Sequence, residues 1–190
     1  YTGAHQVLPL GSEHIPPVVN SRARSGIVQV ARLEPLKNQI KLIEAVRSLN
    51  LSLRIIGEAA PAHHSYEKRC RKMGGEQVRF LGSASVEEVG SALAHAQVHA
   101  LPSYYESTGL ASIEALLCGC QIVVSDHPIQ REIFGEHAFY GDPSSVESIA
   151  AALEKALSST EEHQAWAKAH FRWEGAAGRL KEEYQKLLGL

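Results

Sequence analysis

Short apolar runs alternate with longer amphipathic stretches along most of this chain. Ile27-Val28-Gln29-Val30-Ala31 is one such run, and Ile40, Ile43 and Val46 then fall on one face of a helix. Because short strands separated by helices are typical of βαβ units, the alternation predicts an α/β domain with a mostly parallel sheet. Strands are predicted at residues 27–31, 51–56, 78–81, 98–101, 122–124 and, more weakly, 138–140.

Right-handed crossovers between parallel strands place helices on both faces of the sheet. The fold class predicted for residues 26–165 is therefore a Rossmann-like, three-layer α/β domain with a sheet of about six strands. Residues 1–25, which several prolines interrupt, are interpreted as an interdomain linker. Residues 166–190 are interpreted as one C-terminal helix. Helices inside the domain are predicted at 39–49, 63–73, 86–96, 108–117 and 146–157.

Composition narrows the class of protein further. The chain has 190 residues, of which 44% are apolar and 21% charged, as in a globular domain with its own core. The net charge of -2 disfavours nucleic acid as a partner, and no apolar run approaches the ~20 residues of a membrane-spanning helix. Three cysteines without a regular spacing predict a cytoplasmic protein rather than a disulfide-stapled secreted one. The first residue is Tyr rather than Met, which is compatible with a fragment.

The loop after the first predicted strand contains two cations, Arg32 and Lys37. Ligands of parallel sheets bind at the carboxyl ends of the strands, so both cations are expected near a ligand. Two cations beside the amino end of a helix suit a diphosphate. On charge alone, a surface position with Arg32 paired to Glu34 is slightly favoured. The chain has neither GxGxxG nor GxxxxGK[ST], which argues against a dinucleotide-binding dehydrogenase and a P-loop NTPase.

The loop after the fourth predicted strand leads into a helix and contains two carboxylates, Glu106 and Glu114, with Gly109 between them. Gly109 permits a ligand to approach the backbone, and the helix dipole favours an anion there. Glu114 is then placed to accept the vicinal hydroxyls of a ribose, and Glu106 those of a second sugar. The alternative is a favourable charge at a helix start, which suits Glu106 well but suits Glu114, within an apolar stretch, poorly.

Several segments follow one another at spacings that match a known family. They read VARLEPLKN at 30–38, IGE at 56–58, FLG at 80–82, LPSYYESTGLASIEA at 101–115 and CGCQIVVS at 118–125. The fourth segment contains an E-x7-E signature. In this order the segments resemble the carboxyl-terminal, donor-binding half of a retaining, family-4 or group 1 glycosyltransferase of the GT-B fold.

The resemblance implies that the chain binds a nucleotide-diphosphate sugar and takes part in sugar transfer with retention of configuration. It implies neither a metal nor another cofactor, because cations would stabilise the departing diphosphate. The implied catalytic residues are Arg32, Lys37 and Glu106. The implied donor-binding residues are Glu114, Gly109, Leu110, Thr108, Phe80 and Gly57. Thr108 stands where the family usually has an aromatic residue, which predicts a different sugar preference.

The resemblance also implies a partner domain. An amino-terminal domain would hold a carbohydrate or lipid-linked acceptor, and residues 166–190 would cross onto it. The chain alone is then expected to be inactive, and Trp166, Phe171 and Trp173 either expose apolar surface or pack on the domain itself. Basic residues at 69–72 are compatible with peripheral contact at the cytoplasmic face of a membrane. Alternatives are a non-enzymatic nucleotide-binding or interaction module, or a GT-B sugar-nucleotide epimerase or phosphorylase on the same fold.

Overall fold

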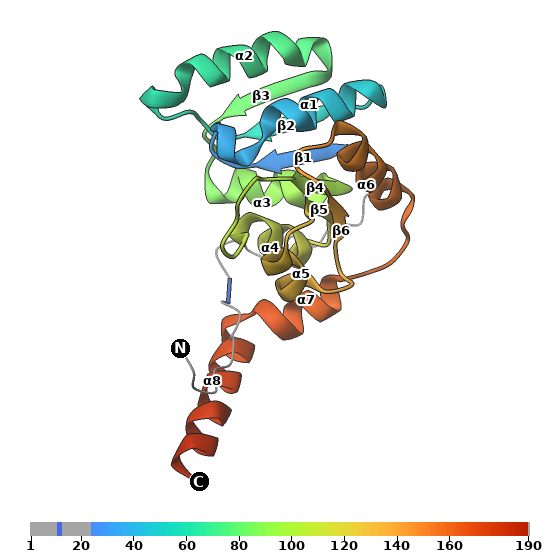
Figure 1. Cartoon of the computed structure of the whole chain (residues 1–190). Coiled ribbons are helices and arrows are strands. Elements are labelled where there is room, and N and C mark those ends of the chain that lie inside the picture. The colour runs from blue at the N-terminus through green and yellow to red at the C-terminus, as the bar shows by residue number, and fades with distance from the viewer. Residues whose placement is uncertain (1–10, 13–23, 190) are drawn as a thin grey trace.

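The computed structural model describes Gly11, Ser12 and residues 24–189, and within them it contains one six-stranded parallel sheet (Figure 1). The strands lie in the order β3-β2-β1-β4-β5-β6. This order places β1 and β4 side by side at the point where the winding of the chain reverses. The bounds are β1 Ile27–Val30, β2 Leu53–Ile56, β3 Val78–Gly82, β4 Val98–Leu101, β5 Gln121–Ser125 and β6 Phe139–Gly141.

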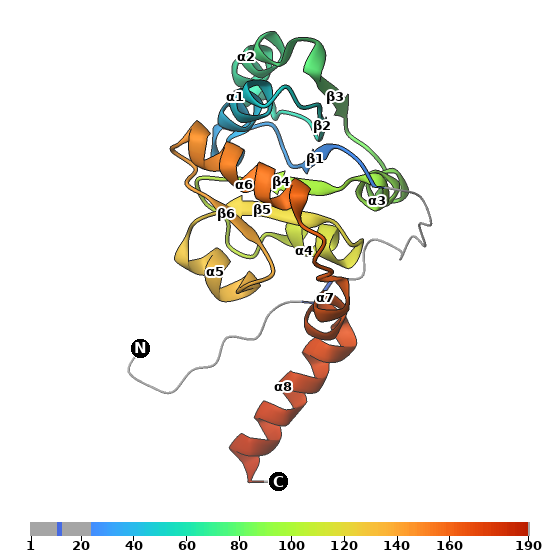
Figure 2. The same cartoon turned by 90° about the vertical axis from the view of Figure 1, so that its right-hand side faces the viewer.

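Helices cover both faces of the sheet, which confirms the predicted three-layer α/β class (Figure 2). One face packs against α1 (Gln39–Ser48), α2 (His64–Gly74) and α6 (Val146–Ser158). The other packs against α3 (Val86–His95), α4 (Leu110–Leu117), α5 (Pro128–Phe134) and α7 (Gln164–Phe171). Short 3-10 helices span Pro35–Lys37, Pro61–His63 and Gly75–Gln77.

The core divides into two clusters because side chains alternate along each strand. Ile27 and Leu53 point to the α1 and α6 side, whereas Val28 and Ile56 point to the α3 and α4 side. The near-continuous apolar strands of the sequence are therefore those of a parallel sheet buried on both faces. Ser85 caps α3 with a capping box, in which its hydroxyl accepts from the Glu88 amide.

Two helical predictions were wrong. No helix was predicted at α5, which begins at Pro128 after His127 and ends at Phe134, before Gly135. Residues 166–190 do not form one helix, because Arg172 is extended (φ -75°, ψ 146°) and separates α7 from α8 (Trp173–Leu188). The break has a packing reason: Phe171 is buried against the α4 side of the core, whereas Trp173 is 47% exposed.

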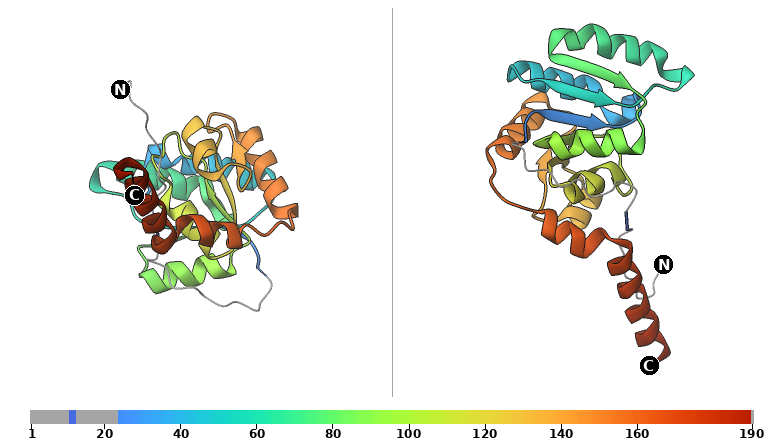
Figure 3. Two further views of the ribbon diagram at one scale, coloured as in Figure 1. Left: turned by 90° about the horizontal axis from the view of Figure 1, so that it is seen from below. Right: turned by 180° about the vertical axis from the view of Figure 1, so that it is seen from behind.

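The helix α8 extends away from the body of the domain (Figure 3). Phe171 packs on the domain itself, and Trp166 is partly buried there, so the exposed-surface alternative holds only for Trp173. The predicted linker at 1–25 lies mostly outside the described residues. Within its described part, the Ser12 amide donates to the Phe171 carbonyl. Within the described part of the chain, no helix is long and apolar enough to cross a membrane.

Candidate functional site

A cavity of about 270 Å³ opens at the carboxyl ends of β1 and β4. It lies at the switch point of the sheet, where ligands of open parallel sheets bind. Of the predicted site residues, the cavity brings together Lys37, Glu106, Thr108, Gly109 and Leu110. Its remaining lining residues are Val30, Ala31, Leu101, Ser107 and Ala111.

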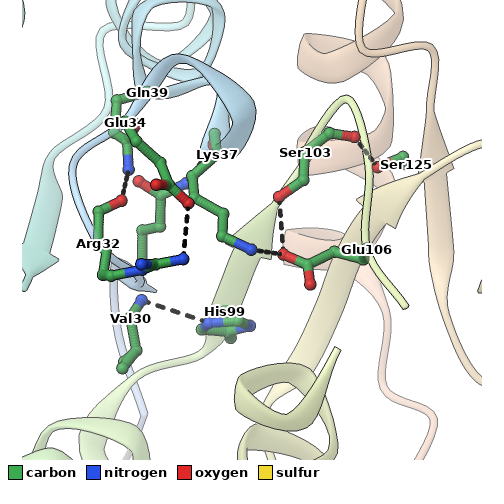
Figure 4. A network of polar contacts seen from close by, with 10 residues as sticks. Val30, Arg32, Glu34, Lys37, Gln39, His99, Ser103, Glu106 and Ser125 are labelled. Carbon is green, nitrogen blue, oxygen red and sulfur yellow. Dashed lines mark hydrogen bonds and ion pairs between the residues drawn. The ribbon is translucent and has the colours of Figure 1, made fainter. Parts of the chain in front are cut away.

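Lys37 and Glu106 form the central ion pair of the site (Figure 4). Lys37 Nζ lies 2.6 Å from Glu106 Oε1, and the two side chains are only 17% and 11% exposed. Ser103 Oγ donates to the same carboxylate oxygen at 3.0 Å. The 3-10 turn that begins at Pro35 ends at Lys37, so the lysine lies just before α1. A cation and a carboxylate thus face one cavity.

Arg32 does not line the cavity. Its guanidinium pairs with Glu34 at 3.2 Å, and its side chain is 73% exposed. This is the arrangement that charge alone slightly favoured. Because an exposed ion pair contributes little free energy, the pairing does not prevent Arg32 from turning toward an anion. The Arg32 backbone is fixed more firmly, since Gln39 Nε2 donates to its carbonyl at 2.9 Å.

Buried amide and hydroxyl groups hold the two loops together, and sequence reasoning gave them no role. Asn38 is 2% exposed and donates Nδ2 to the carbonyls of Pro102 and Pro143, at 2.9 and 2.8 Å. It adopts a left-handed conformation (φ 56°), which asparagine tolerates better than most residues. Ser125 Oγ donates to the Ser103 carbonyl. An asparagine directly after Lys37, at the entry to a helix, was the available signal.

Gly109 forms the amino-terminal boundary of α4. The helix begins at Leu110, two residues later than predicted, and Gly109 is its N-cap with φ 70°. A Cβ at this position would lie 3.2 Å from Gln130 Oε1, so both the conformation and the space favour glycine. Leu110 is 43% exposed at the cavity. Leu110 and Ala111, the first two residues of α4, line the cavity, and the amides at the amino end of a helix attract anions.

The other predicted donor-binding residues do not line the cavity. Gly57 has φ 133°, and a Cβ there would lie 2.1 Å from the Ala31 carbonyl oxygen, so this glycine lets the ends of β2 and β1 approach. Phe80 lies toward α2, where the Arg71 guanidinium sits 4.7 Å from its ring centroid. Glu114 lies one turn beyond Leu110 on α4 and accepts from Ser12 Oγ at 3.2 Å.

Metal ligands do not gather in the described residues. No group of three or more His, Cys, Asp or Glu side chains there could hold a metal ion. The three cysteines, Cys70, Cys118 and Cys120, are buried and unbridged. Burial raises the pKa of the Cys120 thiol to about 12 and that of Cys70 to about 11. They act as small apolar core residues.

The doubly wound sheet with a charged cavity at its switch point defines a Rossmann-like α/β domain. A model of the family described as "Glycosyl transferases group 1" matches residues 15–173. The chain therefore belongs to the group 1 glycosyltransferases, and its fold is that of the carboxyl-terminal domain of a GT-B enzyme.

Three comparisons show the extent of the similarity. The MMP alpha-(1->4)-mannosyltransferase of Mycolicibacterium hassiacum is 28% identical over 183 residues, which are 88% of this chain and 44% of that protein. Sucrose-phosphate synthase from Thermosynechococcus elongatus is 22% identical with a TM-score of 0.78, over 97% of this chain and 53% of that one. HepE from Anabaena, solved in complex with UDP-glucose, is 21% identical with a TM-score of 0.74, over 87% and 50%. The chain thus spans about half or less of each relative's length.

Proposed function

We propose that this chain is the donor-binding part of a retaining glycosyltransferase and holds a nucleotide-diphosphate sugar in the cavity between β1 and α4. The observation that carries the proposal is the Lys37–Glu106 pair, 2.6 Å apart at the switch point of the sheet and beside the start of α4. HepE has the same fold and was solved in complex with UDP-glucose, which supports a donor of this chemical class.

The two charged groups take different parts of the donor in this proposal. Lys37 binds the diphosphate together with the first-turn N–H groups of α4. One Glu106 oxygen, which now accepts from Lys37 and Ser103, is then released to accept hydroxyls of the transferred sugar. As the glycosidic bond breaks, negative charge develops on the departing diphosphate, and the partly buried ammonium stabilises it. No metal is needed for this neutralisation.

The remaining contacts follow from smaller movements. Arg32 leaves its exposed pair with Glu34 and adds a second cation to the diphosphate. Glu114 exchanges its bond with Ser12 for the ribose hydroxyls. Thr108 contributes a hydroxyl at the sugar side of the cavity, and the segment around Phe80 approaches the base. The acceptor is held by a separate amino-terminal domain, so nucleotide binding, rather than transfer, is the activity expected of this chain alone.

Calorimetric titration with UDP, GDP and ADP tests the proposal directly. We expect one of these nucleotides to bind and Lys37→Met to weaken its binding by about tenfold to a hundredfold, the loss of one charge-assisted contact. Lys41→Met is the matched control, because Lys41 carries the same charge on α1, in a looser 3.9 Å pair with Glu44. Equal affinities for Lys37→Met and Lys41→Met would refute the assignment of Lys37, and binding of none of the three nucleotides would refute donor binding by this chain.

A transfer assay separates an enzyme from a binding module on the same fold. The assay uses a protein that contains this chain together with an amino-terminal domain. Glu106→Gln removes the carboxylate charge and keeps the side-chain shape, so we expect transfer to fall by at least about a hundredfold while nucleotide affinity changes little. No transfer by the unmodified protein would favour the binding-module alternative, and full transfer by Glu106→Gln would refute the role assigned to Glu106. Transfer that survives a chelator would support the metal-independent mechanism.

A further inference from the structure

The middle of β4 carries a histidine between two small apolar residues. Val98 and Ala100 belong to the core cluster on the α1 and α6 side. Since side chains alternate along a strand, His99 points to the opposite face of the sheet, the α3 and α4 side. Its side chain is completely buried. Figure 4 shows the ring next to Val30, where β1 approaches the site.

The His99 ring supplies a hydrogen bond that the ladder between β1 and β4 does not. The paired residues of these strands are Ile27 with Val98 and Val28 with His99. Two residues beyond Val28, the Val30 amide donates to His99 Nε2 at 3.4 Å. A buried amide without an acceptor costs free energy, so the ring takes the place of a backbone carbonyl at this level of the sheet. Val30 itself lines the cavity.

His99 accepts this bond only in its neutral form. A ring nitrogen that accepts carries no hydrogen, so the ring hydrogen lies on Nδ1. Complete burial lowers the pKa of His99 to about 4, which keeps the ring neutral at pH 7. Within the described residues, Nδ1 is buried and has no hydrogen-bond partner. The ring is thus hydrogen-bonded through one nitrogen, to the strand that borders the cavity.

We propose that His99 is a positioning residue of the donor site: its Nε2 fixes the end of β1, and with it the Val30–Ala31 wall of the cavity and the loop that leads to Lys37. This inference rests on the proposed function of the cavity. A role in filling space requires only a ring of similar size, whereas positioning requires the acceptor atom. The two roles therefore differ in what His99→Phe does.

The test compares two substitutions of His99. His99→Phe keeps an aromatic ring and removes the acceptor. In His99→Gln, the side-chain amide oxygen can take the position of Nε2 and accept the same hydrogen bond. Titration uses whichever of UDP, GDP and ADP the unmodified chain binds best. We expect His99→Phe to weaken binding about tenfold and His99→Gln to stay within about threefold of the unmodified chain. The matched control is His95→Phe, which replaces a partly exposed histidine at the end of α3 outside the cavity and should not change the affinity.

Hydrogen exchange of the Val30 amide, followed by NMR, gives a readout that does not depend on nucleotide. We expect faster Val30 exchange in His99→Phe, with unchanged exchange of buried Ile43 in α1. The inference is overturned by unaltered Val30 exchange or unaltered affinity in His99→Phe, or by an equal loss in His99→Gln. An unprotected Val30 amide in the unmodified chain overturns it too. If the unmodified chain binds no nucleotide, the proposed function fails, and Val30 exchange alone decides whether His99 holds β1.

Discussion

Two helices of this domain each have apolar side chains on one face, but only one of these faces is buried. The shorter, α4, spans eight residues and buries Ser112, Ile113, Ala115 and Leu116. The longer, α8, spans sixteen residues and buries none. Its apolar side chains Leu180, Tyr184 and Leu187 share one face and are 43%, 58% and 81% exposed. In Figure 1, α4 lies against the sheet and α8 projects from the domain.

The difference shows that periodicity identifies the apolar face of a helix but not what covers it. The stripe of α4 is covered because β4, β5 and α7 pack against that helix. The helix α8 contacts α7 near its start and then leaves the domain. The family resemblance predicts that the face of α8 crosses onto an amino-terminal domain, and this stays a prediction. Four experiments sharpen the contrast between the buried site region and α8.

The largest effect is expected for truncation in α4. Ile113 is completely buried, so Ile113→Ala should lower the free energy of unfolding by about 3–4 kcal/mol through lost burial and a residual cavity. Leu187→Ala on α8 should change it by less than about 0.5 kcal/mol, since the side chain is already 81% exposed. Urea denaturation of both variants measures the contrast. Similar losses would mean that α8 is covered in solution.

The next effect concerns the loops of the site. Asn38→Ala removes two hydrogen bonds to the carbonyls of Pro102 and Pro143 and places alanine at φ 56°. We expect a loss of about 2–3 kcal/mol, from one buried carbonyl left unpaired and from backbone strain. Asn38→Gly removes the same bonds without the strain and should lose less. Equal unfolding midpoints for Asn38→Ala and the unmodified chain would contradict the role of this residue in joining the loops.

A lower pH should decrease the free energy of unfolding of the domain. The pKa of His99 is about 4 in the folded chain and about 6.5 in an unfolded one, so the unfolded chain binds the proton first. Stability is therefore full above pH 6.5 and falls as the pH decreases, by about 2 kcal/mol at pH 5. Burial and the neighbouring His163 also lower the pKa of His137, which acts in the same direction. In His99→Gln, the difference between urea unfolding at pH 7 and pH 5 should shrink accordingly.

The smallest effect is expected on α8. Lys186 pairs with Glu183 one turn away at 2.6 Å, and the lysine side chain is 68% exposed. Water screens such a pair, so Lys186→Gln should leave the unfolding midpoint unchanged within error. Lys37→Gln, which breaks the partly buried pair with Glu106, should lower it measurably. A shift for Lys186→Gln as large as that for Lys37→Gln would remove the distinction between the two regions.

Much of the site was predictable because its chemistry is local in the sequence. Glu106, Thr108, Gly109 and Leu110 lie in one loop after one strand, and parallel topology brings that loop beside Lys37. The pair of Arg32 with Glu34, two residues away, is also local, and charge alone favoured it. The surroundings of Phe80 and Glu114 were not predictable in this way, because their partners, Arg71 and Ser12, come from other elements.

The sequence by itself determined the α/β class, the order of the strands along the chain and the loops that meet at the switch point. These features depend on the local spacing of apolar residues, which can be read along the chain. Only the tertiary structure decided that Lys37 pairs with Glu106, that His99 hydrogen-bonds to Val30 and that the chain breaks at Arg172. These features depend on which surfaces meet when the layers pack. A buried polar group takes the partner that lies within hydrogen-bond reach, and residues distant in the sequence provide it.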